Sequence, residues 1–270
     1  MSIITISRGS YSKGKEVAEK VAGQLGYECI SREVIIEASE RFKVSEAKLI
    51  KAIHDAPSIF ERISQDKKTF ITYIQSAFTS RLKRDNIVYH GLAGHLLLKG
   101  IPHVLKIRII AEMKDRIATE VERENINEKH ARLFLLKDDK ARRKWTKSLY
   151  GVDPWDSSLY DLVIHIHKLT VDNAVDFICQ AATSEQFKTT EISRQKMEDL
   201  ALACQIKAAL LEQNFDVSVI SEYGNVLVYT KASDRSVYKL EKRVKTLSRE
   251  IEGINNLEVR SGMQFPPDVI

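Results

Sequence analysis

The stretch Ile3-Ile4-Thr5-Ile6, followed by Gly9-Ser10-Tyr11-Ser12-Lys13-Gly14-Lys15, decides the fold of this chain. The β-branched run predicts a short buried strand, and the amphipathic segment 15–25 after the loop predicts a helix. A strand, a glycine-bracketed loop, a lysine and a helix together form an arrangement that binds a polyphosphate. Loop N–H groups and the helix N-terminus face the phosphate oxygens, and the lysine adds a cation. The spacing fits G-x-x-x-x-G-K, but Glu16 stands where a hydroxyl residue normally contacts Mg²⁺. The predicted polyphosphate site consists of Gly9, Ser10, Tyr11, Ser12, Lys13, Gly14, Lys15 and Glu16.

The charge is unevenly distributed along the chain. The net charge is +5, from 42 Lys and Arg against 37 Asp and Glu, yet residues 190–270 hold only 11 of the basic and 12 of the acidic side chains. The positive excess therefore lies in the first 189 residues, together with the predicted loop. An excess of this size suits a small anionic substrate and does not require a nucleic acid partner.

Composition and cysteine spacing restrict the class of protein. The 270 residues suffice for one large domain or two domains, and the hydrophobic fraction of 43% supports real cores. No run approaches the ~18 apolar residues that indicate a membrane-spanning helix. Cys29, Cys179 and Cys204 form no C-x-x-C pair, so we expect reduced cytoplasmic thiols and no metal site.

Five short apolar runs in the first 170 residues predict the strands of a parallel sheet. Several are β-branched on both faces, as buried parallel strands are, and helical stretches separate them. Strands that alternate with helices predict a doubly wound α/β fold. The predicted strands are Ile3–Ile6, Tyr27–Ile30, Asn86–His90, Val104–Ala111 and Asp161–Ile166.

Two long segments between these strands have a helical pattern. Residues 33–83 predict an all-helical insertion at the sheet edge, which can form a flap on the substrate side. Residues 114–147 are unusually rich in charge. They form either a solvated helix face with i,i+4 pairs, such as Asp139 with Arg143, or a mobile lid that lowers arginines onto phosphates.

The composition changes after Ile178. Residues 180–193 are polar and lack periodicity, which predicts a linker. Beyond it, a helix, a hairpin with its turn at Tyr223-Gly224-Asn225, a second helix and a last strand predict a small α+β domain. The predicted elements are Met197–Leu211, Phe215–Ile220, Val226–Tyr229, Val237–Ile251 and Leu257–Arg260. The predicted division is a phosphate-loop domain at 1–180, a linker at 181–193 and an α+β domain at 194–262.

The segment Ile4–Ala22 resembles the start of the cytidylate kinase-like family of P-loop nucleoside monophosphate kinases, through Ser7-Arg8 before the loop and Lys15-Glu16 at its end. Further segments match this family in the right order over about residues 1–180. The resemblance implies a P-loop kinase-type parallel five-stranded sheet flanked by helices. The further matching segments are Leu25-Gly26-Tyr27, Ile87–Gly91, Val104–Ala111 with Asp115-Arg116-Ile117, Asp139–Arg142 and Leu159–Ile164.

The resemblance also implies a reaction, in which ATP phosphorylates a nucleoside monophosphate, with CMP or dCMP as the first guess. Lys15 would supply a cation to the ATP phosphates, and Mg²⁺ would be held mainly by phosphates and water. Arg116 and Arg142 would close over the transferring group as catalytic residues. Asp139 would orient Arg142 or touch the acceptor base. The implied acceptor site consists of Arg32, Asp139, Arg142 and Arg143.

The chain departs from the family pattern around the expected nucleotide. Tyr11 and Lys13 occupy glycine-prone places, and Leu92 stands where the family usually has an arginine after Gly91. Two functions from different classes therefore stay open. The order of the motifs favours a nucleoside monophosphate kinase. The departures favour a regulatory protein that binds a nucleotide without turnover and reports it through the C-terminal domain.

The C-terminal segment 194–262 resembles a BON-like α+β domain in its order of elements and in Gly224 and Gly253. This resemblance implies a protein or small-ligand partner and supplies no catalytic residue.

Overall fold

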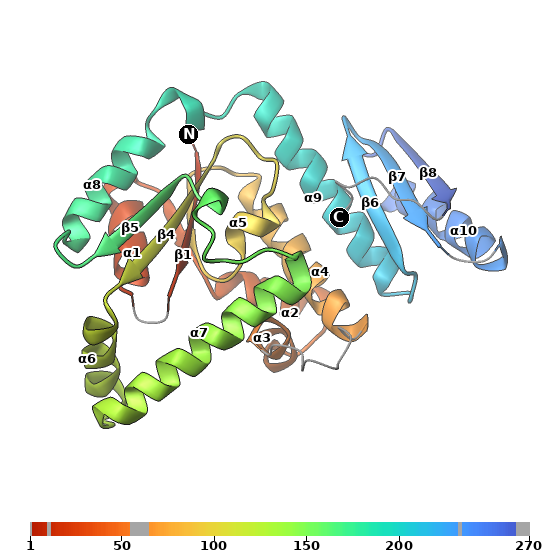
Figure 1. Cartoon of the computed structure of the whole chain (residues 1–270). Helices are drawn as coiled ribbons and strands as arrows, with labels where there is room; N and C mark the ends of the chain where they lie inside the picture. The colour runs from red at the N-terminus through yellow and green to blue at the C-terminus, as the bar shows by residue number, and fades with distance from the viewer. Residues whose placement is uncertain (1, 10–11, 55–64, 232–233, 263–270) are drawn as a thin grey trace.

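The first five strands form one parallel sheet in the order β2-β3-β1-β4-β5 (Figure 1). The computed structural model describes residues 2–9, 12–54, 65–231 and 234–262. Each predicted strand is present within two residues of its expected ends, so the predicted α/β sheet is confirmed. The strands are β1 (Ile3–Arg8), β2 (Glu28–Ile30), β3 (Ile87–His90), β4 (Val104–Ala111) and β5 (Leu162–Ile166).

Helices cover both faces of this sheet because its strands are apolar on both sides. On β1, Ile3 belongs to one core, whereas Ile4 and Ile6 belong to the other, as successive side chains of a strand alternate. The core around Ile4 and Ile6 lies under α1 (Gly14–Leu25) and α8 (Val171–Ala182). The core around Ile3 lies under α2 (Glu33–Phe42), α4 (Gln65–Leu82) and α5 (Gly94–Leu97).

Two helical regions extend beyond the sheet. The predicted insertion at 33–83 contains α2, α3 (Glu46–His54) and α4 within its described residues, and the charged segment consists of α6 (Met113–Glu124) and α7 (Glu128–Tyr150). The long helix α7 returns from the tip of this segment to the core, where Trp145 is buried and donates its indole N–H to the Ala52 carbonyl at 2.9 Å (Figure 1).

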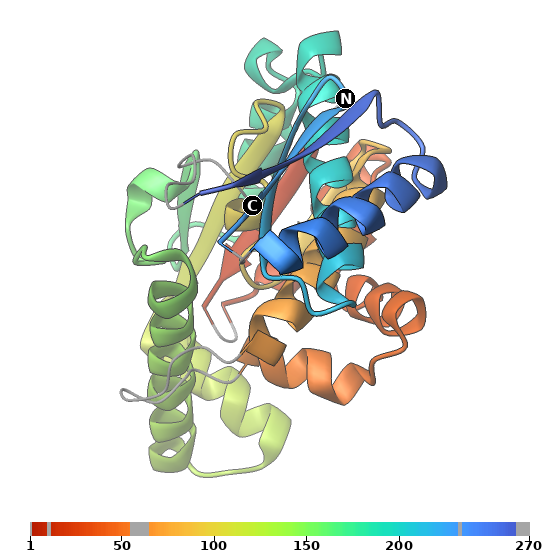
Figure 2. The same ribbon diagram turned by 90° about the vertical axis from the view of Figure 1, so that its right-hand side faces the viewer.

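The C-terminal region carries a second, mixed sheet in the order β6-β7-β8. The strands β6 and β7 form the predicted hairpin with Tyr223 and Gly224 at positive φ, and β8 pairs in parallel with β7. The predicted element order is therefore confirmed. Figure 2 shows this sheet with α10 along it. The elements are β6 (Val217–Glu222), β7 (Asn225–Thr230), α10 (Asp234–Glu250) and β8 (Asn256–Ser261).

The helix α9 (Glu191–Leu211) joins the two regions. It packs on α4 and on β6, with Met197 in the core around Ile3 and Ile206 in the core of the second sheet. The predicted start of this helix, Met197, is six residues late. The predicted linker therefore contains the first turn of α9, and it also contains a short 3-10 helix, η2 (Glu185–Phe187). Another 3-10 helix, η1 (Ser157–Leu159), precedes β5 in the parallel sheet. No helix among the described residues is long and apolar enough to cross a bilayer.

Candidate phosphate-binding site

The predicted phosphate loop leaves the carboxyl end of β1 and leads into α1. Ser12 fastens the base of the loop, because its buried hydroxyl donates to the carbonyls of Gly9 at 3.0 Å and of Ile109 at 3.1 Å. The Gly9 amide donates to the same Ile109 carbonyl at 3.4 Å. These bonds connect the loop to β4, the neighbour of β1. The predicted site residues Ser10 and Tyr11 lie outside the described residues.

The start of α1 offers amide groups to an anion. Lys13 is the N-cap residue in a left-handed conformation, with φ 61°, and its side chain makes no capping hydrogen bond. The first N–H groups of a helix have no intrahelical partner, so they are available to phosphate oxygens. Gly14 is buried, and a Cβ on it would lie 2.8 Å from the Cβ and Cδ of Arg8. Only glycine therefore fits beside Arg8 at this position.

Lys15 and Glu16 lie on the exposed first turn of α1. The Lys15 side chain is 63% exposed and is 3.6 Å from Glu19, whereas Glu16 is 3.6 Å from Lys20. Exposed pairs of this kind contribute only about 0.5 kcal/mol, so Lys15 can leave Glu19 for a phosphate at little cost.

Arg116, on α6, provides a second cation at the loop. It is only 8% exposed, and its guanidinium carbon would lie 3.7 Å from a Cβ on Gly9. Asp139, on α7, holds it in a bidentate pair with both nitrogen–oxygen distances at 2.9 Å. The i,i+4 pair of Asp139 with Arg143 is not formed, because Arg143 pairs with Asp153, whereas the predicted role of Asp139 in orienting Arg142 or touching the acceptor base is not tested and stays a prediction. Asp139 instead fixes Arg116 against the phosphate loop.

The other two arginines predicted on α7 have aspartate partners of their own. Arg142 pairs with Asp138, one helical turn earlier, at 2.8 Å. The Nε of Arg143 is 3.0 Å from both carboxylate oxygens of Asp153, and its guanidinium lies 4.3 Å from the centre of the Trp155 ring. Hydrogen bonding to Arg143 holds the pKa of Asp153 well below its usual range. The charged segment therefore has local ion pairs and brings Arg116 to the loop, whereas its predicted motion as a lid stays a prediction.

On the side of the helical insertion, Arg32 is the N-cap residue of α2. Its guanidinium is 2.7 Å from Glu46 at the start of α3, and the side chain is largely exposed. The expected contact with an acceptor is not tested by this geometry, so it stays a prediction.

Two further arginines were not among the predicted site residues. Arg8 ends β1 and lies against Gly14, and its charge contributes, after burial, to lowering the pKa of His90 at the end of β3. Arg81, on α4, pairs with Glu28 and Glu37. The signal for Arg8 was present in the Ser7-Arg8 motif, whereas nothing local marks Arg81.

The described residues of the loop fit a polyphosphate better than they fit a metal ion. The free amides of α1 and the cations of Lys15 and Arg116 all favour anionic oxygens. The Ser12 hydroxyl donates to two main-chain carbonyls, and the exposed Glu16 side chain is 3.6 Å from Lys20. Within the described ranges, no group of three His, Cys, Asp or Glu side chains is arranged to hold a metal. An Mg²⁺ ion would therefore be held chiefly by phosphates and water.

The N-terminal region that carries this loop is similar to known proteins. The model of the cytidylate kinase-like family matches residues 3–168. The cytidylate kinase of Methanocaldococcus jannaschii is 30% identical over 124 residues, which cover 45% of this chain and 70% of that protein. The cytidylate kinase of Thermoplasma acidophilum is 28% identical over 165 residues, which cover 60% of this chain and 82% of that protein.

A solved structure agrees with the fold. An uncharacterized protein from Eubacterium ventriosum superposes with a TM-score of 0.52 at 22% identity, covering 68% of this chain and all of that one. The family match ends before α8, so it leaves the BON-like resemblance of the C-terminal region a prediction.

Proposed function

We propose, on the premise that this chain belongs to the cytidylate kinase-like family, that it transfers a phosphoryl group from ATP to a nucleoside monophosphate. CMP and dCMP are the first acceptors to test, since the named relatives are cytidylate kinases. The division of the chain at 1–180, 181–193 and 194–262 belongs to the same proposal, with the phosphoryl chemistry in the first part.

The observation that carries the proposal is the Arg116–Asp139 pair over Gly9. Phosphoryl transfer needs little covalent help from the protein and depends on positioning and charge stabilisation. A guanidinium that is fixed by two hydrogen bonds beside the loop loses little conformational freedom when it meets a phosphate. Two 2.9 Å contacts to Asp139 provide that fixation here.

Each proposed site residue then has a defined task. The loop residues from Gly9 to Glu16 bind the β- and γ-phosphates of ATP, and Lys15 exchanges its exposed contact with Glu19 for them. Arg116 stabilises the charge on the transferring group, and Arg142 approaches it after release from Asp138. Bound Mg²⁺ neutralises phosphate charge. Arg32 and Arg143 complete the side that receives the acceptor.

A coupled assay of ADP release with CMP, dCMP, UMP and AMP tests the proposal. We expect turnover that depends on the acceptor, fastest with CMP or dCMP. The control is the same assay without an acceptor, which measures ATP hydrolysis. Measurable ATP binding with no turnover of any acceptor would contradict the kinase proposal and favour the nucleotide-binding regulatory protein.

The regulatory alternative rests on one specific observation. Arg142 and Arg143 are both held by aspartates, Asp138 and Asp153, within or beside their own helix. If these ion pairs persist when a nucleotide binds, the protein would hold ATP but would not bring Arg142 and Arg143 to the transferring phosphate. Calorimetric ATP binding by a protein inactive in the coupled assay is the result that this alternative requires.

A further inference from the structure

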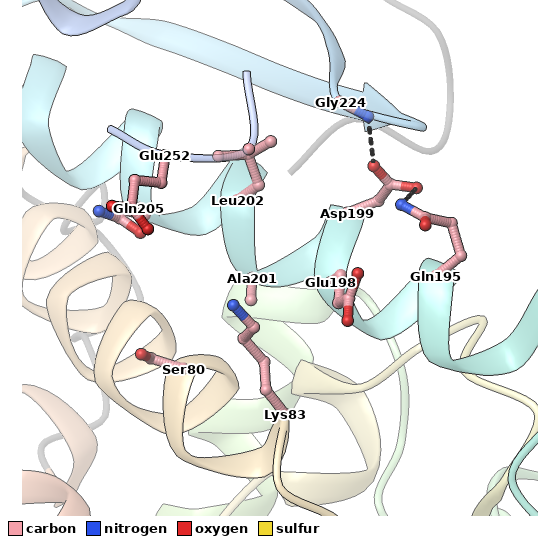
Figure 3. A pocket seen from close by; sticks show the side chains of 11 residues that line it. Ser80, Lys83, Gln195, Glu198, Asp199, Ala201, Leu202, Gln205, Gly224 and Glu252 are labelled. Atoms are coloured by element: carbon pink, nitrogen blue, oxygen red, sulfur yellow. Dashed lines mark hydrogen bonds between the residues drawn. The ribbon is translucent and has the colours of Figure 1, made fainter. Parts of the chain in front are cut away.

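Two cavities lie along α9, and they differ in chemistry. The smaller one, of about 120 Å³, is lined by polar side chains that include Lys83, Glu198 and Glu252 (Figure 3). The Asp199 carboxylate at its edge accepts hydrogen bonds from the amides of Tyr223 and Gly224 and from the side chains of Ser221 and Gln195. Its volume suffices for a small number of water molecules. We assign it no ligand.

The larger cavity is a groove of about 1070 Å³ on another side of α9. One wall comes from the N-terminal region, through α4, α5 and the end of α7, and the other comes from α9 and β6. Drug-sized ligands typically occupy ~300–1,000 Å³, so the groove has room for a whole organic molecule. None of its lining residues belongs to the phosphate loop.

Part of the lining of the groove is apolar. Ile71, Leu96, Leu149 and Leu200 line it, and each is only partly buried by the core against which it packs. Four different elements contribute these side chains. Because an apolar surface gains about 25 cal/mol per Å² when it is removed from water, this wall favours a ligand with an apolar body.

The lining of the groove includes a lysine with no carboxylate partner among the described residues. Lys207, on α9, is half-buried, and burial lowers the pKa of its ammonium group. No carboxylate in the described part of the chain pairs with it, and Lys68 on α4 is close enough to oppose its charge. Asp216 favours the charged form but stands beyond pairing distance. An anion between Lys207 and Lys68 would relieve both the desolvation and the repulsion.

A second polar group in the groove also lacks a partner. The hydroxyl of Tyr150, at the end of α7, is buried and makes no hydrogen bond. A buried hydroxyl without a partner costs about 1–3 kcal/mol, so a polar ligand atom in reach of it would be favoured. Tyr150 and Lys207 both line this groove.

We propose that this groove binds an amphipathic organic anion. Its apolar body lies on Ile71, Leu96, Leu149 and Leu200, and its single carboxylate or phosphate group pairs with Lys207 and Lys68. The ligand bridges the N-terminal region and the second sheet, so it stabilises their junction. The proposal is independent of the kinase proposal, because the two sites share no residue.

Calorimetric titration of the full chain with four probes tests this site. Decanoate and decyl phosphate combine a chain with an anionic group, decanol has only the chain, and inorganic phosphate has only the charge. We expect saturable binding of one molecule of decanoate or decyl phosphate, and at least tenfold weaker binding of decanol and phosphate. The comparison of the two amphiphiles identifies the preferred head group.

Two variants locate the anion. Lys207→Met keeps an unbranched apolar side chain and should weaken binding of the amphipathic anions at least tenfold while leaving decanol binding unchanged. Lys68→Met, at an exposed position on α4, tests the same pairing without touching a half-buried residue. The matched control is Lys83→Met, which changes a lysine of the smaller cavity and should have no effect. Undiminished decanoate binding by Lys207→Met and Lys68→Met, or the absence of saturable binding by both amphiphiles, would overturn the proposal.

Discussion

Two buried or half-buried aspartates, one in each region, have different roles. Asp139 in the N-terminal region holds the Arg116 guanidinium beside Gly9, where a phosphate can reach it. Asp199 in the C-terminal region accepts hydrogen bonds from the amides of Tyr223 and Gly224 and so stabilises the hairpin turn. Both carboxylates are satisfied by several donors. Under the proposed function, the partner of each carboxylate, rather than its burial, distinguishes the aspartate at the site from the aspartate that stabilises the fold.

The two regions also differ in how their polar residues are distributed. The N-terminal region gathers cations at the carboxyl edge of a parallel sheet, the edge where ligands of such folds bind. The C-terminal region is a compact apolar core under a mixed sheet, shared with α9. Substitutions of the cations in the N-terminal region should lower activity with little loss of stability. Substitutions in the core of the C-terminal region should lower stability with little direct effect on activity.

Lys15→Ala should have the largest effect of these substitutions, and the effect should be on activity and not on stability. Loss of a cation aimed at the transferring phosphate should lower kcat/KM about 100-fold or more and weaken ATP binding. The free energy of unfolding should change by only about 0.5 kcal/mol, because the exposed contact with Glu19 contributes little. Coupled assay, calorimetry and urea unfolding check these values.

The matched control for Lys15 is Lys20→Ala, on the next turn of α1. Lys20 pairs with Glu16 and Asp172 and should be dispensable for turnover. Unaltered ATP binding by Lys15→Ala would show that the loop has been assigned to the wrong ligand.

Ile206→Ala tests whether the two regions unfold together. Removal of this fully buried side chain from the second core should cost about 3 kcal/mol, whereas Ile206→Val should cost about 1 kcal/mol. Because α9 also carries Met197 in the first core, we expect the tryptophan fluorescence transition to shift as well. Both tryptophans, Trp145 and Trp155, lie in the N-terminal region. A fluorescence midpoint that stays in place while the far-UV signal shifts would separate the regions into independent units.

Asp139→Asn and Asp199→Asn compare the two aspartates directly. Asp139→Asn should lower kcat about tenfold, because Arg116 loses a charged partner that positions it. Asp199→Asn should leave kcat unchanged and lower the free energy of unfolding by about 2 kcal/mol, since its amide nitrogen would face backbone N–H groups. The same assay and urea series measure both variants. Equal effects of the two substitutions on kcat would contradict the division of roles.

The smallest effect should come from His95, on α5, through pH. It is 5% exposed, neither ring nitrogen has a hydrogen-bond partner, and burial lowers its pKa to about 3. Below a pH of about 6.5 the unfolded chain binds a proton here that the folded chain does not, so stability falls as the pH falls. Between pH 7.5 and 5.5 the loss should be about 1 kcal/mol.

Urea unfolding of His95→Phe at the two pH values checks this cause. The substitution keeps a ring against Tyr160, whose centre is 4.6 Å from that of His95, and removes the titrating group. The variant should lose less stability over this pH range than the natural chain. An unchanged loss would assign the pH dependence to other groups.

The elements followed well from the sequence where apolar periodicity was strong. All five strands of the parallel sheet and the helix–hairpin–helix–strand order of the C-terminal region were predicted. The start of α9 was missed because its first turn is polar and exposes Ile192. A local signal existed there, since Thr190 and Ser193 form a capping box.

The candidate site was only partly predictable. The loop from Gly9 to Lys15 was visible because its glycine spacing and its place after a strand are local properties. The pairing of the arginines was not visible. Local spacing favoured Asp139 with Arg143, one helical turn apart, but Arg143 pairs with Asp153 and leaves Asp139 to Arg116.

The sequence by itself determined the five apolar runs that form the parallel strands, the glycine spacing of the loop and the position of Lys15 at the start of α1, because each depends on residues close in the chain. Only the tertiary structure decided that Asp139 meets Arg116 and that α9 serves two cores. These contacts join residues that are distant in sequence, and the packing of α6 against α7 and of α9 against α4 and β6 brings them together. The pairing of Asp139 with Arg116 follows from that packing, whereas the i,i+4 pair of Arg142 with Asp138 follows from the periodicity of α7 alone.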